Sequence, residues 1–97
     1  MSAYVVAHVQ VHDASGYAEY ARAFRREFPP GCGVQVIAAD DAALPLEGAW
    51  PHARTVILRF EDADAAVRWH GSARYRQIAK LRLTAATSLL ALVRGID

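Results

Sequence analysis

Two segments of this chain place a continuous apolar face opposite a mixed one, and this pattern constrains the fold more than any other feature. The first runs from Tyr4 to His12 and the second from Arg54 to Glu61. A period of two residues is typical of a β-strand, because successive side chains point to opposite sides of a sheet. The sequence therefore predicts a sheet with one fully covered face and one face of different character.

A helix is predicted after the first strand, because from Tyr17 to Phe28 the aromatic residues recur at spacings of three and four. Asp13 and Ser15 are suitable capping residues for its start. Pro29-Pro30-Gly31 then ends it, since proline cannot continue a helix. A second strand is expected from Gly33 to Ala38.

A second helix is predicted after Asp62, which is a suitable cap. Gly71-Ser72 interrupts this helix, and Ser72 can cap a further segment from Ala73 to about Ala86. The last strand is expected from Ser88 to Ile96. Between the second and third strands, Asp40 and Asp41 turn the chain, Leu44 to Glu47 is interpreted as a small edge strand, and Gly48 to His52 forms a loop.

The order strand, helix, strand, strand, helix, strand predicts one α+β domain over residues 1–97 with a ferredoxin-like β-α-β-β-α-β layout. Its sheet should be antiparallel, with both helices on one face. The other face carries His8, Gln10, Thr55 and Arg59 among valine, isoleucine and tyrosine. This mixture is too apolar for a wet face and suits contact with a copy of itself, so we expect a homodimer whose two sheets form a barrel.

Composition narrows the classes of function. The net charge is +1, and no basic stripe follows the ten arginines and one lysine, so a nucleic-acid partner is not expected. The sequence contains no run of ~18 apolar residues that could cross a membrane, and no signal-type segment is seen before the first strand. These observations predict a cytoplasmic protein without a membrane contact. Cys32 is the one cysteine. His8 and His12 lie ~13 Å apart along a strand, so one metal ion could not reach both, and no metal site is expected. The sequence has no glycine-rich phosphate loop, and no other cofactor is expected.

The chain resembles the domain of unknown function 1330 family over nearly its whole length. The resemblance rests on the following motifs: Tyr17-x-Glu19-Tyr20, Glu47-Gly48-x-Trp50, the Arg54-to-Phe60 strand, Trp69-x-x-Ser72-x-x-Tyr75, and Leu81-Arg82. It implies the dimeric α/β-barrel form of the ferredoxin-like fold, a form shared by cofactor-free monooxygenases, muconolactone isomerases and stress-responsive barrel proteins.

Three positions depart from the pattern of that family. Ala39-Asp40-Asp41 replaces its usual Arg-Gly-Gly, and Trp69-His70 replaces Trp-Tyr. Gly71 and Ala73 stand where an aspartate and a proline are usual. A role that depends on the missing arginine or tyrosine therefore does not carry over to this chain.

Charged side chains among apolar neighbours supply the candidate chemistry. His70 is either a general acid or base, or a solvated histidine at a helix end. Arg59 and Arg82 each need a carboxylate partner or an anionic ligand if they are buried. Glu47 is the natural structural partner for one of the two arginines. His8 either lines a pocket or makes a hydrogen bond inside the barrel.

The predicted pocket lies between the sheet and the second helix. It is bounded by Trp69, His70, Tyr75 and Arg82, with the Trp50 loop at its edge, and Tyr20 could offer its hydroxyl to a ligand. Two functions remain open. One is a cofactor-independent enzyme that oxygenates, isomerises or moves a proton on a hydrophobic or aromatic acid. The other is a non-catalytic module that binds a small molecule or another protein.

Overall fold

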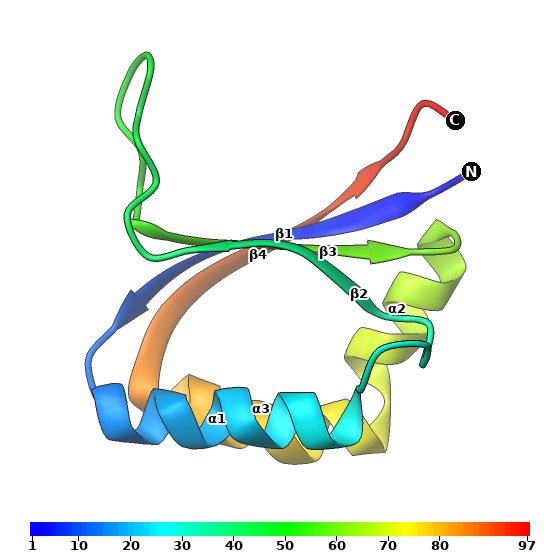
Figure 1. Ribbon diagram of the computed structural model, residues 1–97, viewed down its shortest axis with the longest axis horizontal. Coiled ribbons are helices and arrows are strands. Elements are labelled where there is room, and N and C mark those ends of the chain that lie inside the picture. The colour runs from blue at the N-terminus through cyan, green and yellow to red at the C-terminus, as the bar shows by residue number, and fades with distance from the viewer.

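The computed structural model describes residues 1–97 as four strands and three helices. In chain order the elements are β1 (Ala3–Val11), α1 (Ala14–Glu27), β2 (Gln35–Asp40), β3 (Arg54–Phe60), α2 (Ala63–Gly71), α3 (Ala73–Ala85) and β4 (Ala86–Arg94). The strands form one antiparallel sheet in the order β2-β3-β1-β4. α1 and α3 lie side by side on one face of this sheet, and α2 lies at one end of it (Figure 1). The predicted ferredoxin-like α+β fold is confirmed.

Side-chain caps set the starts of the three helices. The Asp13 carboxylate accepts a hydrogen bond from the Gly16 amide at 3.1 Å, and Asp62 accepts one from Ala65 at 2.8 Å. Ser72 Oγ accepts from the Tyr75 amide at 3.1 Å, so the Gly71-Ser72 interruption separates α2 from α3 as predicted. Ser15 lies within the first turn of α1 and is not its cap.

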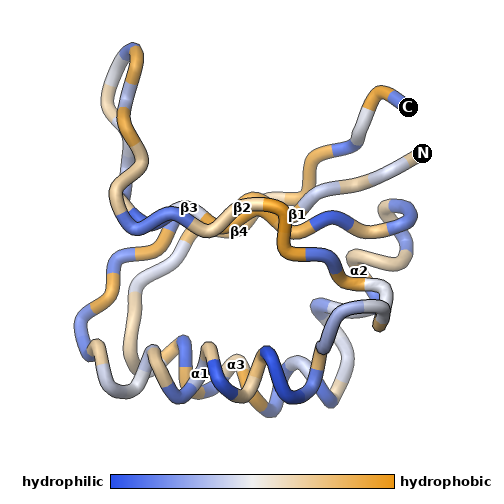
Figure 2. The backbone as a smooth tube through the Cα atoms, viewed as in Figure 1, coloured by the Kyte–Doolittle hydropathy of each residue, from blue (hydrophilic) through white to orange (hydrophobic).

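The core lies between the sheet and the helices. We call the face of the sheet that carries Val5, Leu58 and Phe60 the inner face, because these buried residues pack on the helices. α1 and α3 alternate between polar and apolar residues along their length (Figure 2), as expected of helices with one side in solvent. None of the three helices combines the length and apolarity that a membrane crossing requires.

The opposite face of the sheet, which we call the outer face, is covered by no helix (Figure 1). Alternation along β1 and β3 places Val6 and Ile57 on it as direct cross-strand neighbours. Leu89 and Val93 of β4 lie on the same face and are exposed. The two unlike faces predicted from the sequence are therefore present.

Residues 41–53 form an arm that rises from the sheet on the side of the outer face (Figure 1). A strand was expected at Leu44 to Glu47, and this expectation is wrong, because the arm contains no helix or strand. The physical reason is that the arm rises away from the sheet, so its backbone does not pair with the free edge of β2. One backbone hydrogen bond, from the Ala43 amide to the Ala53 carbonyl at 3.0 Å, closes the base of the arm.

Candidate functional site

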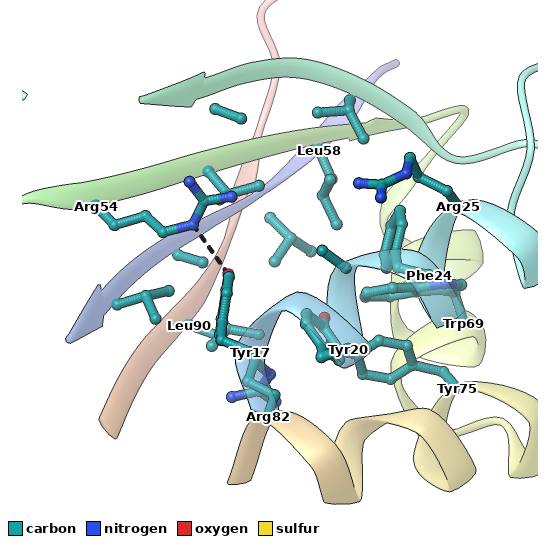
Figure 3. A pocket seen from close by; sticks show the side chains of 17 residues that line it. Tyr17, Tyr20, Phe24, Arg25, Arg54, Leu58, Trp69, Tyr75, Arg82 and Leu90 are labelled. Atoms are coloured by element: carbon teal, nitrogen blue, oxygen red, sulfur yellow. Dashed lines mark hydrogen bonds between the residues drawn. The ribbon is translucent and has the colours of Figure 1, made fainter. Parts of the chain in front are cut away.

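A cavity of about 300 Å³ lies between the inner face of the sheet and the helices. Fourteen of its 17 lining residues are hydrophobic, which suits a ligand with an apolar body. Five aromatic side chains contribute to the wall: Tyr17, Tyr20, Phe24, Trp69 and Tyr75 (Figure 3). The volume is at the lower end of the range for ligand sites, so the cavity fits a compact molecule.

Arg82 is the buried cation of this cavity. Arg82 projects from α3 and is only 7% exposed. Its guanidinium carbon lies 5.9 Å from the centre of the Tyr20 ring. Its Nε is buried without a hydrogen-bond partner. The four ion pairs of the chain use other cations, so no carboxylate neutralises Arg82.

The hydroxyls of Tyr20 and Tyr75 lie next to this charge. They form a buried hydrogen bond of 2.8 Å that joins α1 to α3. Burial, followed by the proximity of Tyr75, raises the pKa of Tyr20 far above its ordinary value, so this phenol remains a proton donor. Burial works to lower the pKa of Arg82, but the two neighbouring phenols outweigh it and leave the pKa raised. The site therefore offers a permanent positive charge with the neutral Tyr20 hydroxyl beside it.

Arg54 and Tyr17 border the same cavity at the end nearest the arm, and the sequence interpretation missed both. Arg54 Nε donates to Tyr17 Oη at 3.0 Å, and its Nη1 pairs with Asp41 at the base of the arm. A signal was present, because Arg54 falls in register with the apolar face of its strand. An arginine at such a position faces the core side, where it requires a partner.

His70 does not join the group predicted for the pocket. Trp69, Tyr75 and Arg82 line the inner cavity of about 300 Å³, whereas His70 is exposed and borders a separate cavity of about 180 Å³ between α2 and β4. The reason is helical geometry. Neighbouring residues on a helix point about 100° apart, so His70 turns away when Trp69 points into the core.

Trp50 and His8 lie on the outer face rather than at the edge of the cavity. Their ring centres are 4.6 Å apart in an edge-to-face arrangement, and Trp50 Nε1 donates to Thr55 Oγ1 at 3.1 Å. His8 Nδ1 is buried without a partner. The predicted position of Trp50 at the pocket edge is wrong, because the arm leaves the sheet on the side opposite the helices (Figure 1).

Glu47 pairs with neither of the two arginines, which corrects the expected structural ion pair. It lies exposed in the arm, far from the helices that hold Arg82. Arg59 instead donates to Ser2 Oγ at 2.6 Å and lies 3.9 Å from the Asp97 carboxylate. Arg59 therefore lies on the outer face beside Ser2 and Asp97. It borders a different, wider cavity of about 920 Å³ and does not line the cavity between the sheet and the helices.

The fold and the cavity define a class, a ferredoxin-like α+β domain with an apolar pocket between sheet and helices. Residues 2–96 match the family described as Domain of unknown function (DUF1330). The chain therefore belongs to this family, as the sequence motifs predicted. No protein of curated function matches the sequence.

Solved structures from several organisms share this fold. A protein of unknown function, RPA0582 from Rhodopseudomonas palustris, is 21% identical with a TM-score of 0.69 over 99% of this chain and 83% of that one. SnoaB, a cofactor-independent oxygenase from Streptomyces nogalater, is 20% identical with a TM-score of 0.60 over 99% and 94%. A dimeric ferredoxin-like protein of unknown function from Jannaschia sp. CCS1 is 8% identical with a TM-score of 0.69 over 98% and 100%. At these identities the similarity shows the fold alone.

Proposed function

We propose that this chain binds a small hydrophobic or aromatic acid in the inner cavity, with Arg82 holding the carboxylate. One observation carries the proposal. A buried guanidinium that has no carboxylate partner faces a largely apolar cavity. Tyr20 and Tyr75 add hydroxyls within the same site.

Electrostatics favours an acid over a neutral ligand. A buried charge is costly unless an opposite charge and hydrogen bonds compensate it. A ligand carboxylate would supply both to Arg82, and hydrogen bonds between charged groups are the stronger kind. The aromatic wall would at the same time cover an apolar or aromatic ligand body.

Titration calorimetry tests this proposal with benzoate, phenylacetate and the corresponding uncharged amides. The acids should bind at least about tenfold more tightly than the amides, which corresponds to ~1.4 kcal/mol. Arg82→Ala should remove this preference, whereas Arg94→Ala should retain it because Arg94 lies exposed at the end of β4. Equal affinity for acids and amides, or an unchanged preference in Arg82→Ala, would contradict the proposal.

Cofactor-independent oxygenation is a second candidate function, favoured by the shared fold with SnoaB. In this version Arg82 and the Tyr20 hydroxyl would stabilise an oxyanion that develops on the bound acid. The cavity is lined by no carboxylate and no imidazole that could take a proton, which is why binding comes first. Oxygen uptake in the presence of a phenolic acid tests for turnover. His70→Ala should leave any such uptake unchanged, because His70 borders a separate cavity.

We further propose that the protein works as a homodimer joined through the outer face. Ile57 and Val6 are adjacent on this face, and Leu89 and Val93 are exposed beside them. A self-complementary contact around a two-fold axis would cover all four residues in both copies. The description of the Jannaschia protein as dimeric is consistent with this arrangement.

A further inference from the structure

We infer that the arm, residues 41–53, is a docking element for a second copy of this chain, and that it packs Leu44 and Leu46 against the partner's outer face. This inference rests on the proposed homodimer and goes beyond it. It assigns the arm a role in assembly that the sheet contact alone does not require.

The surface of the chain indicates how much of it a partner should cover. A monomer of this mass, 10.6 kDa, typically exposes about 5,500 Å². This chain exposes 6306 Å², an excess of about 800 Å² over that value. An interface of standard size takes about 800 Å² from each partner. The excess is therefore comparable in size to the area that each partner loses in a stable dimer contact.

The arm carries two of the most exposed large hydrophobic side chains. Leu44 and Leu46 are 81% and 89% exposed, although leucine is among the residues most often buried. The body of the same chain does not cover them, because the arm rises away from the sheet (Figure 1). Two solvated leucines, two positions apart on a projecting loop, are typical of an element that contacts another molecule.

The position of the arm selects a second copy as that molecule. The arm rises on the side of the outer face (Figure 1), so a second copy that covers this face would lie beside the arm. Trp50 anchors the arm at this junction through its contacts with His8 and Thr55. Asp41 fixes the base of the arm through its ion pair with Arg54. A partner seated on the outer face therefore meets an arm that is already oriented toward it.

Sedimentation equilibrium of the whole chain tests the inference with an arm variant and a matched control. The double variant Leu44→Asp/Leu46→Asp places two charges on the arm. Leu83→Asp makes the same change at an exposed leucine of α3, on the helix side of the molecule. We expect the arm variant to raise the dimer dissociation constant at least about tenfold. The control should stay within about twofold of the parent chain.

Two different failures can be told apart. A parent chain that is monomeric throughout the micromolar range would overturn both the homodimer and the role of the arm. A parent dimer whose dissociation constant is unchanged in the arm variant would overturn the role of the arm alone. Because both leucines are solvated, the variant should keep the circular dichroism spectrum of the parent chain.

A spin label gives a second measurement that does not depend on weakening the dimer. In a Cys32→Ser background, Leu44→Cys and Leu83→Cys each offer one site for labelling. The label at position 44 should lose mobility as the protein concentration rises through the dimerisation range, while the label at position 83 should not. Equal mobility of the label at position 44 in monomer and dimer would contradict the inference.

Discussion

No carboxylate of the chain pairs with the buried Arg82 guanidinium, and its neighbours are the phenols of Tyr20 and Tyr75, so binding and stability should place opposite demands on it. Its Nε is buried without a partner, and no ion pair reaches it. Replacing an imperfectly compensated buried charge with an apolar side chain of similar volume is often neutral or stabilising by ~1 to 4 kcal/mol. An arginine that is buried without a carboxylate partner does little for folding stability, so its presence is better explained by a role in ligand binding.

We therefore expect Arg82→Met to leave the free energy of unfolding unchanged or to increase it by up to ~2 kcal/mol. The same variant should lose its preference for acids over amides. Urea denaturation of ligand-free protein, read by tryptophan fluorescence, measures the first effect. A loss of ~3 kcal/mol or more would instead identify Arg82 as part of a structural network, as expected when one member of a buried pair is removed.

The charge state of the site predicts how binding depends on pH. The pKa values of Tyr20 and Arg82 are both raised, so the phenol stays neutral and the guanidinium stays charged at ordinary pH. Simple carboxylic acids are ionised throughout the same range. The affinity for benzoate should therefore be constant between about pH 6 and pH 9. Calorimetry at several pH values checks this expectation, and a steep loss of affinity near neutral pH would indicate a histidine as the anchor.

The interruption between α2 and α3 shows how one serine fixes the direction of two helices. Ser72 Oγ accepts from the Tyr75 amide at 3.1 Å and donates to the Trp69 carbonyl at 2.7 Å. Both neighbours are large aromatic residues of the cavity wall. The position of the wall therefore depends on this cap as well as on packing.

Ser72→Ala should lower the free energy of unfolding by about 1 kcal/mol, the usual cost of removing a helix cap. Ser15→Ala is the matched control, because Ser15 is exposed within the first turn of α1 and caps nothing. It should change stability by less than ~0.5 kcal/mol. Thermal unfolding of both variants gives the comparison, and equal destabilisation would show that the Ser72 hydrogen bonds do not hold the break.

Phe60 and Phe24 lie on the apolar stripes of β3 and α1, but the two side chains have different surroundings. Phe60 is buried against Trp69, with ring centres 5.1 Å apart, while Phe24 is partly exposed and borders the cavity. Phe60→Ala should cost ~3 to 5 kcal/mol, and Phe24→Ala should cost less, because part of its ring meets empty space. Urea denaturation measures the free energy of unfolding of the two variants. An equal loss of stability in both would mean that the cavity beside Phe24 is filled in solution.

A helix or strand could be predicted from the sequence where its signal comes from neighbouring residues. Capping at Asp13, Asp62 and Ser72 depends on a few neighbouring residues, and period-two alternation in β1 and β3 depends on the strands themselves. The arm was mistaken for a strand at Leu44 to Glu47, because a short apolar run does not reveal whether a neighbouring strand exists to pair with it.

The candidate site was predictable only in part, because its members come together through the tertiary fold. Trp69, Tyr75 and Arg82 share the buried side of the second helical region, and their spacing reveals this. The contact of Tyr20 with Tyr75 joins residues 55 positions apart, and no local pattern encodes it. His70 was misplaced because its neighbour Trp69 was treated as sharing its direction, which helical geometry forbids.

At the scale of the whole molecule, one face of the sheet is covered by helices and the other is not. Helices on a single face leave an antiparallel sheet with one open side, which must be either wet or covered by a partner. Here that side combines Ile57, Val6 and Leu89 with few charges, and the arm rises beside it. The proposed dimer would therefore supply the second layer that the chain itself lacks.

Ile57→Glu should convert the dimer into a monomer, because it places an unpaired charge at the centre of a covered surface. Val67→Glu is the matched control, since Val67 is an exposed valine of α2 away from the outer face. We expect sedimentation velocity to give about twice the chain mass for the parent protein and for the control, but a single chain mass for Ile57→Glu. The melting temperature should rise with concentration only in the two dimeric proteins, because binding to the native state adds stability by mass action. A dimer that persists in Ile57→Glu would show that the two copies meet through a surface other than this face of the sheet.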